Sequence, residues 1–238
     1  MTRVISREVF AVHIGLIGGI GPAATEYYYR GLIERYARSD KVLELTIVHA
    51  DLRELAQNLV NRAAQRQAEA FLRLVRRLAS AGAELAAITS MGGHFCVEEL
   101  IRTSPLPILN AIPEVEAVIR RRNLNTIGIF GTKMVMETAL YGGIRSARVV
   151  LPEGDALEQV HSNYFEMAVT GRVTDAQRRV FFSIGRRLCH EQGAEAVILG
   201  GTDLFLAFAG RDCGFPVIDC AEVHVDALHH RAAGDPTR

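Results

Sequence analysis

An internal repeat is the feature that most constrains the fold of this chain of 238 residues. Three segments of the first half recur in the second half in the same order. The matching pairs are Ile14–Gly19 with Ile127–Thr132, Gly82–Glu84 with Gly193–Glu195, and Pro107–Asn110 with Pro216–Asp219, at offsets of 113, 111 and 109 residues. Offsets this constant predict that the second half is a structural copy of the first.

Short apolar runs alternate along the chain with longer amphipathic stretches, a pattern typical of strand–helix units around parallel sheets. The expected strands are Val12–Ile17, Leu45–His49, Leu85–Thr89, Ile108–Leu109, Thr126–Phe130, Arg148–Leu151, Ala196–Leu199 and Val217–Ile218. The expected helices include Pro22–Arg38, Ala63–Ala81, Pro113–Arg122, Met134–Ile144, Asp175–Gln192 and Ala221–Arg231.

We therefore expect an α/β fold of two pseudo-symmetric, doubly wound parallel-sheet domains. The first would comprise residues 12–110 plus 216–238, and the second residues 111–215. Domains of roughly 100–120 residues are of ordinary size.

Charge and cysteine usage narrow the class of protein. Lys+Arg and Asp+Glu both number 27, so nothing favours nucleic acid or an anionic membrane as a partner. No apolar run reaches the roughly 18 residues that a membrane span needs. The four cysteines form no CxxC pair and have no metal-ligand spacing. We expect a cytoplasmic protein with reduced thiols and no metal.

The loops that follow the first and third strand of each half indicate where a ligand would bind. In open α/β sheets, ligands bind beyond the carboxyl ends of the strands. Two facing domains would bring residues 18–21, 90–93, 131–133 and 200–203 around one interdomain cleft. These loops are rich in glycine and small hydroxyls, so their backbone N–H groups and the following helix N-termini suit a small anion. The predicted ligand is therefore a small anion bound in this cleft.

Several longer motifs resemble the aspartate/glutamate racemase family, specifically its aspartate-racemase branch. They are Ile14–Pro22 with Ala24-Thr25 and Tyr27–Tyr29, Phe130–Glu137 with Tyr141, Glu158–His161 with Tyr164 and Gly171, and Val197–Asp203. The similarity runs from about Val12 to His230. It implies a cofactor-independent, homodimeric isomerase of small acidic amino acids, in which two cysteines on opposite faces of the substrate exchange the α-proton.

This chain departs from the family at both thiols. The family's Cys-Asn-Thr-x-His segment reads Ser90-Met91-Gly92-Gly93-His94 here, so Ser90 takes the position of the first cysteine. The family's Gly-Cys-Thr-Glu reads Gly200-Gly201-Thr202-Asp203, so Gly201 takes the position of the second. A hydroxyl is a far weaker acid than a thiol, and glycine has no side chain at all. The symmetric two-base mechanism therefore cannot run as it does in the family.

The candidate catalytic residues are Ser90, His94 and Asp203. Ser90 is either a proton relay that His94 deprotonates or a capping or ligand-binding hydroxyl. His94 is either a general base or a helix residue bonded to nearby backbone. Asp203 is either a base, or a partner for His94, or a stabilising acid in a first helical turn. Cys96 could replace the lost thiol, although a buried structural cysteine is the commoner case.

The candidate substrate-binding residues are Gly19, Arg53, Met91, Gly92, Thr132, Gly201 and Thr202. Thr132 and Thr202 match family positions that hold substrate carboxylates. Arg53, just past the second strand, is either a ligand for a second carboxylate or a solvated surface arginine.

Three hypotheses of function follow. The first is an enzyme acting at the α-carbon of a small acidic amino acid or carboxylate, by racemisation or by one-sided proton transfer in decarboxylation, elimination or cyclisation. The second is a binding protein that has lost catalysis. The third is a dinucleotide-dependent oxidoreductase, because residues 19–24 satisfy GxGxxA, although Asp51 lies about thirty rather than twenty residues beyond.

Overall fold

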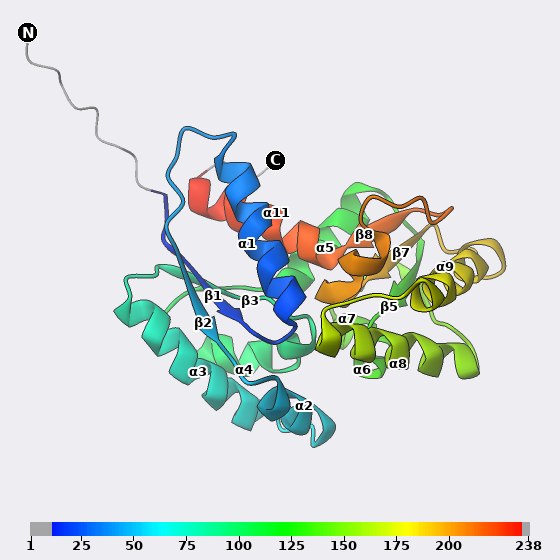
Figure 1. Ribbon diagram of the computed structural model, residues 1–238, viewed down its shortest axis with the longest axis horizontal. Coiled ribbons are helices and arrows are strands. Elements are labelled where there is room, and N and C mark those ends of the chain that lie inside the picture. The colour runs from blue at the N-terminus through cyan, green and yellow to red at the C-terminus, as the bar shows by residue number, and fades with distance from the viewer. Residues whose placement is uncertain (1–10, 235–238) are drawn as a thin grey trace, which may run out of the picture.

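Two four-stranded parallel sheets form the core of the computed structural model, which describes residues 11–234 (Figure 1). The strand orders are β2-β1-β3-β4 and β6-β5-β7-β8, so the second sheet repeats the first strand for strand. The strands are β1 (Ile14–Gly18), β2 (Leu45–His49), β3 (Leu85–Ile88), β4 (Ile108–Leu109), β5 (Thr126–Phe130), β6 (Arg148–Val150), β7 (Ala196–Leu199) and β8 (Val217–Asp219). The predicted fold class, a pair of pseudo-symmetric α/β sheets, is confirmed.

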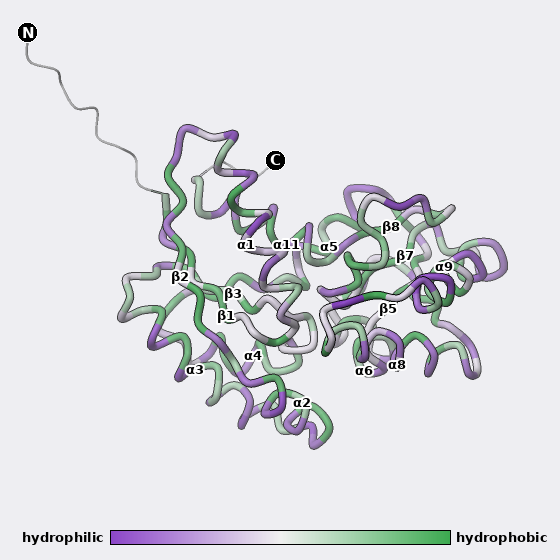
Figure 2. Tube along the Cα trace, viewed as in Figure 1, coloured by the Kyte–Doolittle hydropathy of each residue, from purple (hydrophilic) through white to green (hydrophobic). Residues whose placement is uncertain are grey.

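Helices cover both sheets and lie on the outside of the molecule. The α-helices are α1 (Pro22–Tyr36), α2 (Leu52–Val60), α3 (Ala64–Ser80), α4 (Val97–Thr103), α5 (Ala111–Arg121), α6 (Lys133–Glu137), α7 (Ala139–Gly142), α8 (Asp155–Thr170), α9 (Asp175–His190), α10 (Phe205–Phe208) and α11 (Cys220–Ala233). Two short 3₁₀ helices, η1 (Gly92–Cys96) and η2 (Thr202–Leu204), follow β3 and β7. Figure 2 shows hydrophilic segments on the outer helices and loops and apolar ones through the sheets. No helix among residues 11–234 combines the length and apolar character that crossing a bilayer requires.

The first repeated segment places a glycine in the central strand of each lobe. A Cβ on Gly15 would lie 2.9 Å from Leu78 Cδ1 of α3, and a Cβ on Gly128 would lie 2.9 Å from Leu188 Cδ1 of α9. Every residue of β1 is buried, as is typical of a central parallel strand covered on both faces. The glycines therefore let one helix pack closely on each sheet.

Of the other two repeated segments, one lies where a helix ends in each half, and the other lies where a helix begins. Gly82 and Gly193 follow α3 and α9 with φ of 91° and 74°, the left-handed conformation that favours glycine at a helix end. Asn110 and Asp219 are the N-caps of α5 and α11, and each side chain accepts a backbone N–H two residues later. Each repeated motif thus has a local structural cause.

Two features of the second half differ from the expected elements. The helix expected over Met134–Ile144 is divided into α6 and α7, because Ala139, Leu140 and Tyr141 have φ of 48°, 53° and 59°. Left-handed backbone cannot continue a right-handed helix, so it divides the helix here. This conformation costs a non-glycine residue roughly 1–2 kcal/mol. The expected helices also omitted α8, which carries site residues.

The C-terminal helix α11 returns to the first lobe. Its residues Ala221, Val225 and Leu228 pack in one apolar cluster with Ile14 and Leu16 of β1. Strand β8, in contrast, pairs with β7 in the second sheet. We therefore propose a division in which the first lobe comprises residues 11–110 plus α11. The chain then returns to it after β8 rather than at residue 216.

Candidate active site

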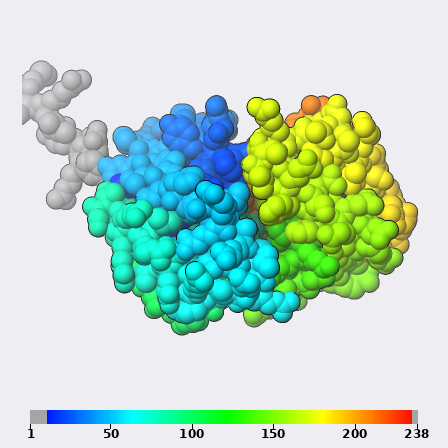
Figure 3. Space-filling model, turned by 60° about the horizontal axis from the view of Figure 1, so that its bottom comes forward, coloured from blue at the N-terminus to red at the C-terminus, as the bar shows by residue number. Residues whose placement is uncertain are grey.

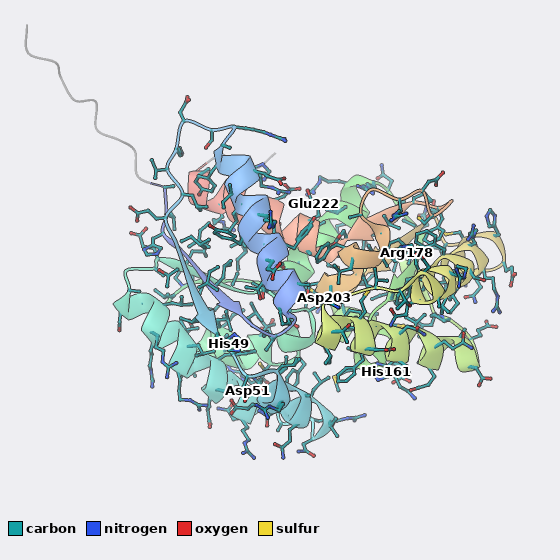
Figure 4. All side chains as sticks on the ribbon, viewed as in Figure 1. His49, Asp51, His161, Arg178, Asp203 and Glu222 are labelled. Carbon is teal, nitrogen blue, oxygen red and sulfur yellow. The ribbon has the colours of Figure 1, made fainter. Side chains whose placement is uncertain are left out.

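The carboxyl ends of β1, β3, β5 and β7 carry the four loops from which the site is built. A hydrogen bond of 3.0 Å joins the two lobes there, because the Ala24 N–H at the start of α1 donates to Asp203 Oδ1. Within the first lobe, the Thr25 and Thr89 hydroxyls lie 3.4 Å apart and link the β1 loop to the β3 loop. Ser90 follows Thr89 directly, so these bonds connect both thiol-equivalent loops. Figure 4 places Asp203 between the lobes at the start of α1.

Asp203 is an acidic residue at this junction. It belongs to the second lobe, and its carboxylate accepts a hydrogen bond from the first lobe. Its residue is 1% exposed, and a Cβ on Gly21 would lie 2.2 Å from its Oδ2. Gly21 has φ of 74°, so glycine is required there both for the backbone and for the carboxylate. Burial raises the pKa of Asp203 to about 7, and the Ala24 N–H opposes that rise. Among the described residues, no hydrogen bond connects Asp203 with His94.

His94 does not reach the Ser90 hydroxyl, contrary to the proton-relay prediction. Its Nδ1 lies 2.8 Å from the backbone carbonyl of Ser90, and its Nε2 accepts the Ala111 N–H at 3.3 Å. The ring is 2% exposed, and burial lowers the pKa of His94 to about 4. A neutral imidazole bonded to backbone at both nitrogens supports the structural alternative. Ser90 itself is 6% exposed, and its hydroxyl bonds to none of the described residues.

Gly201 faces a tyrosine ring that fills the space of any side chain there. A Cβ on Gly201 would lie 2.3 Å from Cε2, 2.4 Å from Cζ and 2.8 Å from the hydroxyl oxygen of Tyr164. Tyr164 projects from α8 and is 5% exposed. Burial, and secondly the charge of Asp203, raise the pKa of Tyr164 well above its usual value. The glycine and the tyrosine are therefore complementary.

The two predicted threonines differ in their bonding. Thr132 is the N-cap of α6, and its hydroxyl accepts the Val135 N–H at 3.3 Å. Thr202 is fully buried, and its hydroxyl has no hydrogen-bond partner among residues 11–234. A buried hydroxyl without a partner is costly, and a ligand carboxylate would satisfy it. Ligand binding by Thr202 thus stays a prediction, whereas the Thr132 hydroxyl caps α6.

The remaining predicted binding residues lie in different environments. Gly19 has φ of 86°, and its N–H donates to the Thr25 hydroxyl. Gly92 accepts the Tyr141 hydroxyl at 3.4 Å through its carbonyl. Met91 is a correction, because its side chain is fully buried in the apolar cluster of the second lobe. The side chain therefore joins the lobes by packing instead of facing a substrate.

Arg53 also differs from the substrate-binding prediction. Its side chain is 95% exposed and pairs at 3.7 Å with Asp51, the N-cap of its own helix. Asp51 lies just before α2, at the bottom of the molecule in the view of Figure 4. These contacts fit the solvated surface arginine.

Besides Tyr164, the structure adds three residues that the sequence did not single out as site residues. A Cβ on Gly19 would lie 2.3 Å from His49 Nδ1, so this imidazole covers the β1 loop. His161 of α8 accepts the Lys133 N–H at 3.2 Å and covers the β5 loop. Tyr141 reaches the β3 loop from α7. The motif matches at His161, Tyr141 and Tyr164 were the available signal.

The cysteines do not replace the missing thiols. Cys96 is fully buried, its Sγ lies 3.4 Å from the Gly93 carbonyl, and burial raises the pKa of its thiol to about 12. Cys220 is fully buried, and its thiol pKa is raised by desolvation. All four cysteines are unpaired. Residues 11–234 contain no group of three or more acidic, histidine or cysteine side chains placed to hold a metal ion.

The arrangement can bind a small anion and move a proton on one side. Backbone N–H groups of the glycine loops and the Thr202 hydroxyl supply donors. Asp203 and Tyr164 are the titratable groups beside Gly201. In Figure 3 the blue-to-cyan first lobe and the green-to-yellow second lobe meet along a seam.

Known proteins share this architecture over nearly the whole chain. A family model described as Asp/Glu/hydantoin racemase matches residues 17–228. A candidate Asp/Glu racemase from Yersinia pestis superimposes with a TM-score of 0.80 at 24% identity, covering 93% of this chain and 99% of that one. An aspartate racemase homologue from Pyrococcus horikoshii OT3 is 27% identical, with a TM-score of 0.76 and the same coverage of 93% and 99%.

The similarity extends to more distant structures. The allantoin racemase from Klebsiella pneumoniae superimposes with a TM-score of 0.58 at 14% identity, covering 96% of this chain and 91% of that one. At this identity the likeness shows the fold alone. The resemblance drawn from the sequence motifs is confirmed.

Proposed function

Because the chain belongs to the Asp/Glu/hydantoin racemase family, whose model spans residues 17–228, we propose that it acts at the α-carbon of a small acidic amino acid or related carboxylate without a cofactor. Enzymes of this family are isomerases. The two-thiol chemistry that the resemblance implies is absent here, so the reaction we propose transfers a proton on one face only.

The observation that carries this proposal is the asymmetry between the two thiol-equivalent positions. Ser90 offers a hydroxyl that His94 does not contact by a hydrogen bond, because both nitrogens of His94 are bonded to backbone. On the other side, Gly201 is covered by Tyr164, with Asp203 close by. Racemisation needs a proton acceptor and a proton donor that exchange roles. A site with a carboxylate and a phenol beside Gly201, and with the imidazole near Ser90 bonded to backbone, suits decarboxylation, elimination or cyclisation better.

The binding part of the proposal rests on Thr202 and the start of α1. A substrate carboxylate would satisfy the unpartnered Thr202 hydroxyl. The N-terminal end of α1 attracts negative charge, and in this structure the Asp203 carboxylate lies there.

The test is incubation of the enzyme, purified with a metal chelator, in D2O with aspartate, glutamate and 2-aminomalonate. NMR would follow α-deuteration and loss of CO2, and chiral chromatography would follow inversion. Release of CO2, or α-deuteration without inversion, is the expected result. Deuteration with inversion would establish racemisation instead. Ligand binding by calorimetry without any turnover would leave only a binding protein.

We further propose a homodimer in the cytoplasm. Tyr29 and Ile33 of α1 are 47% and 42% exposed, and Phe165 and Val169 of α8 are 47% and 49% exposed. Apolar side chains one helical turn apart on neighbouring helices suit a subunit interface. Four unpaired cysteines suit a reducing compartment. Light scattering of the wild type and of Phe165→Glu would test the dimer.

A further inference from the structure

Tyr164 lies where a thiol at residue 201 would project. Its hydroxyl oxygen would be 2.8 Å from a Cβ on Gly201, and its ring carbons would be closer still. The side chain is held from outside the loop, because Tyr164 belongs to α8 whereas Gly201 follows β7. A phenol can donate a proton, as a thiol can. The position left bare by glycine is therefore covered by a different acid.

The surroundings leave this phenol available to a ligand. Its hydroxyl bonds to none of the described residues, although the residue is only 5% exposed. The neighbouring Thr202 hydroxyl is fully buried and also has no hydrogen-bond partner within residues 11–234. The lack of a partner among the described residues is unusual for the buried Thr202 hydroxyl, because buried polar groups are normally bonded, and the Tyr164 hydroxyl lies beside the same loop. A bound carboxylate substrate would satisfy both.

We propose that Tyr164 is the proton donor of this enzyme, delivering a proton to the α-carbon from the side of Gly201. This rests on the proposed function. In a decarboxylation, the bond from the α-carbon to one carboxylate breaks, CO2 leaves, and the electron pair remains as an enolate. The Tyr164 O–H bond then breaks, the α-carbon–hydrogen bond forms with the enolate pair, and the resulting phenolate regains a proton from water.

The environment of Tyr164 makes the transfer run in one direction. Burial and the nearby Asp203 carboxylate raise the pKa of the phenol well above its usual value, so it stays protonated at neutral pH. It can give a proton to an enolate, which is a far stronger base, but before the reaction it is not a phenolate that could remove one. One-sided delivery implies a product of a single handedness.

The test uses 2-amino-2-methylmalonate, which yields alanine when it loses one carboxylate. The wild type is expected to form a single enantiomer of alanine. Tyr164→Phe keeps the ring against Gly201 and removes only the hydroxyl, so kcat should fall by about 10²- to 10⁴-fold. Tyr36→Phe is the matched control, because Tyr36 is also 5% exposed with an unpartnered hydroxyl, but lies in the α1–α11 core. Its kcat should stay within about twofold of the wild type.

A second pair of variants moves the acid back to residue 201. Tyr164→Ala opens space beside the loop, and adding Gly201→Cys should restore at least about tenfold of the lost kcat, since a thiol donates a proton readily. Tyr164→Ala with Gly201→Ala has the same Cβ without the thiol and should not recover. This comparison controls for loss of packing, because both double variants lack the tyrosine ring.

The outcomes separate the two proposals. Racemic alanine from the wild type, or a Tyr164→Phe enzyme within threefold of the wild-type kcat, would refute the role of Tyr164 and leave the proposed function standing. Turnover of aspartate without turnover of the malonate would also refute that role and leave the proposed function standing. Absence of turnover with every acidic substrate would overturn both.

Discussion

Replacing Asp203 with asparagine tests the electrostatics of the lobe junction. The variant keeps an oxygen to accept the Ala24 N–H and removes the charge. Burial raises the pKa of Asp203 from 3.8 to about 7 in the folded protein. Between these pH values the folded chain holds a proton that the unfolded chain has lost. Stability from this group is therefore complete below pH 4 and is lost as the pH rises through 7.

The magnitude follows from the size of the shift. A shift of one pKa unit corresponds to about 1.4 kcal/mol, so ionised Asp203 costs the folded protein about 4 kcal/mol at pH 8. At pH 5 the raised pKa destabilises the folded protein by about 1–2 kcal/mol, because pH 5 lies only about one unit above the pKa of Asp203 in the unfolded chain. Relative to the wild type, Asp203→Asn should gain about 2–3 kcal/mol more at pH 8 than at pH 5. Any cost of burying the amide is the same at both pH values and cancels.

Urea denaturation at both pH values, with the wild type in parallel, measures this difference. Asp51→Asn is the matched control, since Asp51 also caps a helix but has an exposed side chain. Its effect should differ between the two pH values by less than about 0.5 kcal/mol. If Asp203→Asn likewise changes the free energy of unfolding equally at pH 5 and pH 8, the carboxylate is not held in a desolvated junction.

Three further predictions concern other candidate site residues. His94→Ala should lower the free energy of unfolding by about 2–4 kcal/mol through two lost bonds and a cavity, whereas Ser90→Ala should cost under about 1 kcal/mol; equal losses in urea would contradict the structural role of the imidazole. Gly201→Ala should cost about 1–3 kcal/mol by overpacking, and a double-mutant cycle with Tyr164→Leu should recover most of it; strict additivity would show that the two do not touch. Arg53→Ala should leave the affinity for L-aspartate within about twofold by calorimetry, since a solvated arginine contributes little; a tenfold loss would return it to the site.

The fold could be predicted because its repeated motifs each have a local cause. Gly15 and Gly128 leave room for a helix packed closely on a strand, and Gly82 provides the left-handed backbone at a helix end. Such causes depend on residue type and spacing, which a sequence displays. The divided helix at Ala139 could not be predicted, because nothing in the composition of that segment signals a left-handed turn.

The site was predicted less completely, since its partners come from distant parts of the chain. The types of residue at the strand ends were visible, but the bonds of His94 go to backbone groups, which carry no sequence signal. The contact between Asp203 and the start of α1 joins residues 179 positions apart. Tyr164 was visible only as a motif match, and its place over Gly201 depends on how α8 packs.

The return of α11 to the first lobe has a consequence for biosynthesis. A ribosome releases this helix only after the entire second sheet has been made, yet Ala221, Val225 and Leu228 complete the apolar layer over Ile14 and Leu16. Until then the nascent first lobe exposes that layer, the kind of surface that chaperones bind. The two lobes should therefore reach their native state together, and a chain interrupted before Cys220 should yield neither lobe in a form that resists proteolysis.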